Sequence, residues 1–100
     1  AGAEFAAFVS VWRKLPNIDN VILNPTTAEV PTEPSVLYAL TGALARRASD
    51  ATAGQLIQYA DRLPQEFGVL LVRDCSRRCS EFTTTRPYID WTSRNADVLL

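Results

Sequence analysis

The sequence predicts an all-α protein, a compact bundle of about five helices joined by short, proline-marked connections. Three observations support this prediction. Apolar residues recur at spacings of three and four in successive segments, which is the period of an amphipathic helix. Prolines stand near the ends of these segments, where helices stop or begin. The 100 residues, 47% of them hydrophobic, suffice for one compact domain, so we expect residues 1–100 to form a single domain.

The first predicted helix lies in AEFAAFVSVWRKLP and ends at Pro16. Its apolar stripe consists of Phe5, Phe8, Val9, Trp12 and Leu15. The next segment, NIDNVILNP, predicts a single helical turn that either Asn17 or Asp19 could cap. Residues 24–34 contain three prolines and predict an extended connector, although a binding loop is the alternative.

The segment TEPSVLYALTGALARRAS predicts a longer helix, with Thr32 as the N-cap and Pro34 in the first turn. Its inward stripe consists of Val36, Leu37, Leu40 and Leu44. Gly42 costs this helix about 1 kcal/mol relative to alanine, so we expect it to permit a close approach of another helix. Arg46 and Arg47 stand at the C-terminal end, where cations interact favourably with the helix dipole.

A further helix is predicted in DATAGQLIQYADRLP. Thr52 and Gln55 have the spacing of a capping box, with Asp50 as the alternative cap. The residues expected to face inward are Leu56, Ile57, Ala60 and Leu63. Pro64 should end this helix and open the next one at its first position.

The segment PQEFGVLLVRDCSRRCS is ambiguous, because FGVLLV alone would also suit a buried strand. A helix is favoured by Pro64 and Glu66 at its start, by the amphipathic continuation and by the absence of partner strands. Its apolar face is wide, and such a helix is expected at the centre of the bundle.

The last helix is predicted in TTTRPYIDWTSRNADVLL, with Thr85 as its cap, Pro87 in its first turn and Asn95 near its end. The residues expected to face inward are Ile89 and either Trp91 or Thr92. Helical spacing also assigns most aromatic residues to the core: Phe5, Phe8, Trp12, Tyr38, Tyr59, Phe67 and Trp91.

Cys75 and Cys79 are the only cysteines, and in a helix they would share a face. A redox role is one hypothesis, because neighbouring arginines can lower a thiol pKa. A shared zinc ion is another, but a structural site needs about four ligands, and the chain has no histidine. We favour a third interpretation, in which both cysteines are small packing residues with no chemical role and Cys75 lies at least partly in the core.

Five arginines are the candidate interaction residues: Arg73, Arg77, Arg78, Arg46 and Arg47. Guanidinium groups bind phosphate or acidic partners. The alternative is a solvated face on which the arginines of the VRDCSRRCS segment pair with Asp74, Glu81 or acidic residues of another helix. The net charge of −1 argues against a dedicated nucleic-acid binder.

Several functional classes find no support in the sequence. There is no histidine, the carboxylates form no evident acid–base pair, and the four glycines are isolated, so no phosphate loop is present. We therefore expect no catalytic residue, no cofactor-binding residue and no metal ligand in this chain. No apolar run suggests a membrane span and no signal peptide is visible, which makes the cytoplasm the default compartment.

The order of segments resembles the C-terminal helical region of MoxR-like AAA+ ATPases of bacteria and their phages. The matching stretches are AEFAAFVSVWRKLPNIDNVILNP, VPTEPSVLYALTGALARRAS, RLPQEFGVLLVRDCSRRCS and YIDWTSRNADVLL, which together span essentially the whole chain. The resemblance implies a parent protein that hydrolyses ATP with Mg²⁺, forms a ring and remodels a client protein in a chaperone-like manner. The ATPase motifs are absent here, so no ATPase residue carries over.

The leading hypothesis is a non-catalytic C-terminal module of such an ATPase. It would contact its own ATPase core, neighbouring subunits or a client, and both ends of the chain look like cuts in a longer protein. One alternative is a free-standing helical interaction module. A less favoured alternative is a small nucleic-acid-binding domain that uses Arg73, Arg77 and Arg78.

Overall fold

The computed structural model describes residues 11–99, and within this range all regular structure is helical, which confirms the predicted all-α class. Residues 11–14 are helical; the rest of the first predicted helix, with Phe5, Phe8 and Val9, lies outside the described residues. The helices that follow are α2 (Ile18–Leu23), α3 (Pro34–Ala45), α4 (Ala53–Ala60), α5 (Gln65–Arg78), the 3-10 helix η1 (Ser80–Thr84), α6 (Arg86–Arg94) and α7 (Ala96–Leu99).

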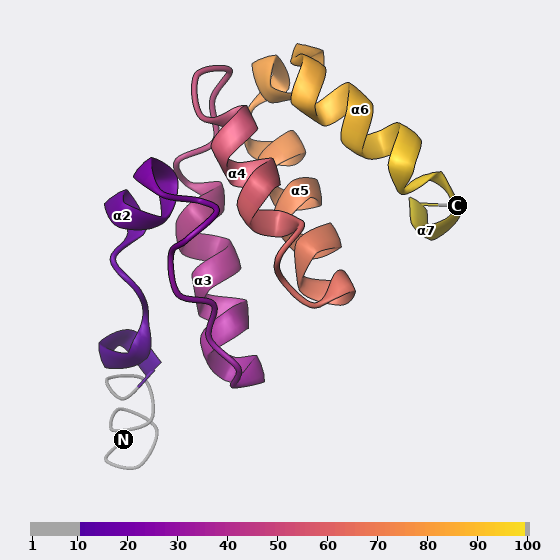
Figure 1. Cartoon of the computed structure of the whole chain (residues 1–100). Helices are drawn as coiled ribbons and strands as arrows, with labels where there is room; N and C mark the ends of the chain where they lie inside the picture. Colours follow the sequence, from indigo (N-terminus) through magenta and orange to yellow (C-terminus); the bar gives the residue numbers. More distant parts are fainter. Residues whose placement is uncertain (1–10, 100) are drawn as a thin grey trace.

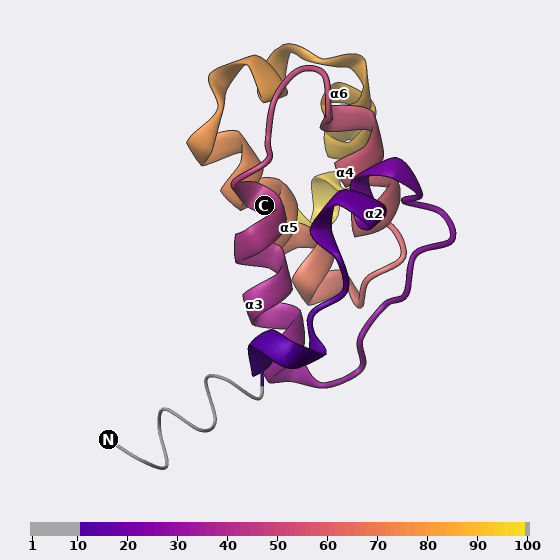
Figure 2. The ribbon, with the colours of Figure 1, turned by 90° about the vertical axis from the view of Figure 1, so that its left-hand side faces the viewer.

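Helix α5 packs against both α3 and α4, and the three helices alternate in direction along the chain, so that α3 and α5 run parallel to one another (Figure 1). Helix α2 packs against α4 on one side, as the turned view also shows (Figure 2), and α6 packs against α4 on the other. Helix α5 contacts α3, α4 and η1, which confirms its predicted central place. The bundle is therefore organised around α5.

The ambiguous segment is a helix, and its amphipathic pattern explains its position. Phe67, Leu71, Val72 and Cys75 are buried along one face, whereas Arg73 is exposed on the opposite side. This spacing of three and four is the helical one. Pro64 precedes α5 as the N-cap and is not its first residue, a shift of one position from the prediction.

A close approach between helices occurs at Gly68, and the prediction that Gly42 permits one with another helix is wrong for the described residues. A Cβ atom at Gly42 would meet no atom within 4 Å. At Gly68 it would lie 2.6 Å from the carbonyl oxygen of Ala60, the last residue of α4. Glycine at position 68 therefore lets the start of α5 pack directly on the end of α4.

Helix α2 has an N-cap side chain that bonds to the helix backbone, whereas α3, α4, α5, η1 and α6 have none. The Oδ1 atom of Asn17 accepts a hydrogen bond from the Asn20 N–H at 3.0 Å, which selects Asn17 over Asp19 as the cap. Thr32 is not a cap, because α3 begins after Glu33, whose side chain makes no capping bond. Pro34 at the first position of α3 instead supplies a backbone angle suited to a helix.

Thr52 is the N-cap of α4 by position, but its hydroxyl does not cap the helix. It donates to the carbonyl of Arg47 at 2.7 Å and accepts from the N–H of Ser49 at 3.0 Å. The predicted capping box with Gln55 is therefore wrong, because no side-chain cap bond forms. The hydroxyl instead closes the tight turn between α3 and α4.

Helices η1 and α6 pack onto the core through Phe82 and Trp91, which are 0% and 3% exposed. The Phe82 ring meets the edge of the Tyr88 ring, with centroids 5.7 Å apart. The prediction that Ile89 faces inward is wrong, since it is 44% exposed. Tyr88 and Trp91 are three residues apart and share the inward face of α6, which turns Ile89 away from the core.

Candidate functional site

Both cysteines are free thiols, and their surroundings favour the interpretation that neither has a redox or metal-binding role. Cys75 is fully buried, which confirms its predicted place in the core, and Cys79 is half-buried. Burial, together with the nearby Asp74 carboxylate, raises the pKa of the Cys75 thiol to about 12. The Cys79 thiol donates a hydrogen bond to the Glu81 carboxylate at 3.3 Å. No group of three or more metal-ligating side chains occurs within residues 11–99.

These environments predict that the two thiols react at very different rates with a water-soluble disulfide reagent. The native protein should release one equivalent of thiolate product quickly, from Cys79, because Cys75 is inaccessible and held in its protonated form. Modification of Cys75 should follow global unfolding. The measurement is the reaction time course with mass mapping, and Cys79→Ser is the control that should remove the fast phase. Fast labelling of Cys75 in the folded chain would contradict this environment.

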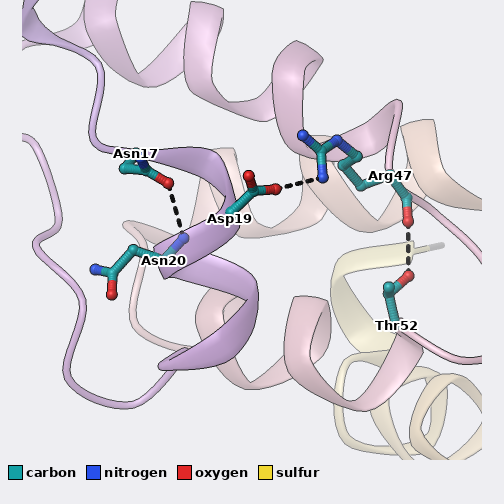
Figure 3. Close-up of polar contacts among 5 residues, drawn as sticks. All are labelled: Asn17, Asp19, Asn20, Arg47 and Thr52. Atoms are coloured by element: carbon teal, nitrogen blue, oxygen red, sulfur yellow. Dashed lines mark hydrogen bonds and ion pairs between the residues drawn. The ribbon is translucent and has the colours of Figure 1, made fainter.

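The five candidate arginines separate into those with an ionic partner and those without one. The Nη1 atom of Arg47 lies 2.6 Å from Asp19 Oδ1 of α2, and its carbonyl accepts the Thr52 bond (Figure 3). The Nη1 atom of Arg77 lies 3.9 Å from Asp74 Oδ1. The remaining three are exposed and have no ion pair with any described residue: Arg46, Arg73 and Arg78. Arg47 thus fixes the end of α3 to α2.

Two hollows on the outer side of α3 and α5 meet at Tyr38, and we call them together the α3–α5 surface. The first, of about 200 Å³, is lined by Val11, Trp12, Tyr38, Ala39, Gly42, Ala43 and Arg46. The second, of about 180 Å³, is lined by Tyr38, Glu66, Phe67, Val69, Leu70 and Arg73. Because Tyr38 belongs to both, the two hollows adjoin at its side chain.

The assignment of Tyr38 and Trp12 to the core is wrong, since Tyr38 is 59% and Trp12 is 48% exposed. The inward positions of α3 are taken by residues one and two positions away, including Leu37 and Leu40, so Tyr38 projects from the side of the helix. Its ring meets the edge of the Phe67 ring at a centroid distance of 4.9 Å. Tyr59, Phe67 and Trp91 are buried as predicted.

The connector after α2 is held by two bonds to its main chain, one from α4 and one from the segment that directly follows α4. The Tyr59 hydroxyl donates to the Glu29 carbonyl at 2.6 Å, and Arg62 Nη1 donates to the Pro25 carbonyl at 2.8 Å. A third hollow, of about 380 Å³, lies beside the connector, and the Lys14–Glu33 ion pair at 3.1 Å is part of its lining. The bonds from Tyr59 and Arg62 give the connector a structural role.

The buried Tyr59 hydroxyl predicts a loss of stability at alkaline pH. Burial raises its pKa to about 12, partly opposed by the Arg62 guanidinium, whereas the unfolded chain should ionise near 10. The neutral hydroxyl is favoured in the folded protein, so its contribution is complete below pH ~10 and is lost as the pH rises to ~12. The two-unit difference corresponds to a fall of about 2–3 kcal/mol in the free energy of unfolding.

Urea unfolding at several pH values between ~8 and ~12 measures this effect. The variant Tyr59→Phe is the control: it should be less stable by about 1 kcal/mol at neutral pH, because the Glu29 carbonyl loses its donor. Its stability should then fall less steeply with alkalinity than that of the original chain. Parallel pH curves for the two proteins would show that Tyr59 does not titrate as described.

Comparison of the chain with models of known protein families, with curated proteins and with solved structures gives no significant match. Within residues 11–99, every helix falls short of the length and hydrophobicity that a bilayer crossing requires. The functional proposal therefore depends on the surface of this chain and on the order of its sequence segments.

Proposed function

We propose that the chain is a helical protein-interaction module. The observation that carries the proposal is the pair of large exposed rings, Tyr38 and Trp12, which line adjoining hollows of the α3–α5 surface. Aromatic residues over hollows are typical of the centres of protein interfaces, where they bury much apolar area at a small entropic cost. Arginines at the margin of such a surface supply polar contacts.

We further propose that the module belongs to the C-terminal region of a MoxR-like AAA+ ATPase. The support is the order of segments from AEFAAFVSVWRKLP to YIDWTSRNADVLL. In such a protein the ATPase core, outside this chain, would bind ATP and Mg²⁺. The α3–α5 surface would contact that core, a neighbouring subunit of a ring or a client protein, and the assembly would work in the cytoplasm.

Photo-crosslinking tests the interaction function. A photoreactive amino acid at position 38 should give a covalent product of higher mass in cells that produce the protein. The same group at position 89, an exposed apolar position on α6, should give none. Equal products from both positions, or no product from position 38, would refute the assignment of an interface to the α3–α5 surface.

The coding sequence upstream of Ala1 tests the ATPase assignment separately. A G-x-x-x-x-G-K-[ST] motif within the preceding few hundred codons is the expected result. Its absence would remove the ATPase from the proposal and leave the interaction module standing alone.

A further inference from the structure

We propose that the α3–α5 surface binds an amphipathic helix of a partner protein that carries acidic residues along its flank. This inference rests on the proposed interaction function and adds to it the chemical class of the partner. Shape and charge support it independently, the first through the floor of the surface and the second through the cations at its margin.

The part of α3 that lines the first hollow contains three small residues. Ala39, Gly42 and Ala43 occupy the outer side of α3 between Tyr38 and Arg46. A Cβ atom at Gly42 would meet nothing within 4 Å, so the space above it is open. From Tyr38 to Arg46 the helix axis runs about 12 Å at 1.5 Å per residue, the length of roughly two helical turns. Small residues allow a second helix to approach closely, and its apolar side chains can fill the two hollows.

The positive charges of the arginines that line the hollows favour a partner with negatively charged flanking residues. Arg46 lines the first hollow and Arg73 the second, and neither has an ion pair with a described residue. Four other exposed arginines each lie within 4.0 Å of a carboxylate: Arg47, Arg77, Arg86 and Arg94. The exposed arginines Arg13, Arg62 and Arg78 also have no ion pair with a described residue, but they line neither hollow. Guanidinium groups that have no ion pair with a described residue and stand beside apolar side chains complement carboxylates of a second molecule.

Glu66 makes the charge differ between the two ends of the α3–α5 surface. It lines the second hollow near the start of α5, whereas Arg46 follows the last residue of the parallel α3. Because α3 and α5 run parallel (Figure 1), Glu66 lies towards the end where both helices begin and Arg46 towards the end where they finish, so the charge changes from negative to positive between these ends. An acidic flank on the partner should lie against the half that holds Arg46 and Arg73.

Two synthetic peptides of about 18 residues test the inference. They share one leucine stripe at helical spacing and differ only in their flanking residues, which are glutamate in one and lysine in the other. Fluorescence anisotropy at low salt should show at least tenfold tighter binding of the glutamate peptide to the full chain. The double variant Arg46→Glu with Arg73→Glu should reverse this preference, and Tyr38→Ala should weaken binding of both peptides.

Matched controls separate this surface from general charge and stability effects. Arg78→Glu changes another exposed arginine of α5 that has no ion pair and lies outside both hollows, and it should leave the preference unchanged. Ile89→Ala removes an exposed apolar side chain elsewhere and should not affect binding. Circular dichroism of every variant establishes that the fold is retained.

Three results would overturn the inference. The first is equal binding of the two peptides, or no binding of either up to about 1 mM by a folded chain. The second is self-association that buries Tyr38, which would make a second copy the occupant. The third is binding that appears only when residues 1–10 are removed, which would make that segment the occupant. If position 38 gives a crosslink but the glutamate and lysine peptides bind equally, the first of these results contradicts this inference and the proposed function still stands.

Discussion

Replacing Phe82 with alanine is expected to lower the free energy of unfolding by about 3–5 kcal/mol, the range for a large aromatic side chain removed from a core. Phe82 is 0% exposed and anchors η1 between α5 and α6. Its ring also meets the edge of the Tyr88 ring, and that contact would be lost. Chemical denaturation followed by circular dichroism measures the change. Domains of this size have total stabilities of about 5–15 kcal/mol, so the variant should be severely weakened.

Ile89→Ala is the matched control for this prediction. Ile89 lies seven positions further along the chain and is 44% exposed on α6, so its truncation should change stability by less than about 1 kcal/mol. Comparable losses for the two variants would mean that Phe82 is not buried as described.

Gly68→Ala is the second change with a large expected effect. The new methyl group would lie 2.6 Å from the Ala60 carbonyl oxygen, a distance that requires α4 and α5 to move apart. Overpacking of this kind costs about 1–3 kcal/mol, and because the obstacle is backbone it cannot rotate away. The higher helix propensity of alanine, worth about 1 kcal/mol, offsets part of the cost. A net loss in urea denaturation is the expected outcome.

Gly42→Ala supplies the opposite expectation within the same protein. Both glycines lie inside helices, but a Cβ atom at Gly42 meets no neighbour within 4 Å. Alanine there should stabilise the chain by about 0.5–1 kcal/mol, because the unfolded chain loses freedom and no contact is strained. If both substitutions stabilised the protein to the same extent, the close approach at Gly68 would be refuted.

The helices could be predicted because their signals are local. Leu37, Leu40 and Leu44 repeat at the helical period, and all three are buried. Proline at positions 34 and 87 lies at or near the first residue of α3 and α6, as its fixed backbone angle suggests. Such signals depend on residues a few positions apart, which a single sequence displays directly.

The errors concern contacts between segments far apart in the sequence. Whether Gly42 or Gly68 permits a close approach depends on where α4 ends in space, and no local pattern contains that information. The hydroxyl of Thr52 had a capping partner available by spacing but bonds to the Arg47 carbonyl instead. The 3-10 helix around Phe82 also lacks the long repeat that reveals an α-helix.

The candidate surface was only half visible in the sequence. Arg46 and Arg73 are among the predicted interaction residues, but Tyr38 was assigned to the core with the other aromatic residues. Its spacing carried a signal: Tyr38 and Gly42 are four residues apart and share a side of the helix that the leucine stripe does not occupy. That side adjoins the second hollow only because α5 lies beside it.

The parallel arrangement of α3 and α5 has a thermodynamic consequence. The ring contact at the centre of the surface joins residues 38 and 67, so neither helix in isolation can form the surface, and only the folded chain is competent to bind. A ligand that binds the folded form alone raises stability by mass action, by about 2.7 kcal/mol at a concentration one hundred times its dissociation constant. Occupancy at that level would compensate for a packing defect as large as the one expected at Gly68. Partner concentration would thereby set how much sequence change this bundle tolerates.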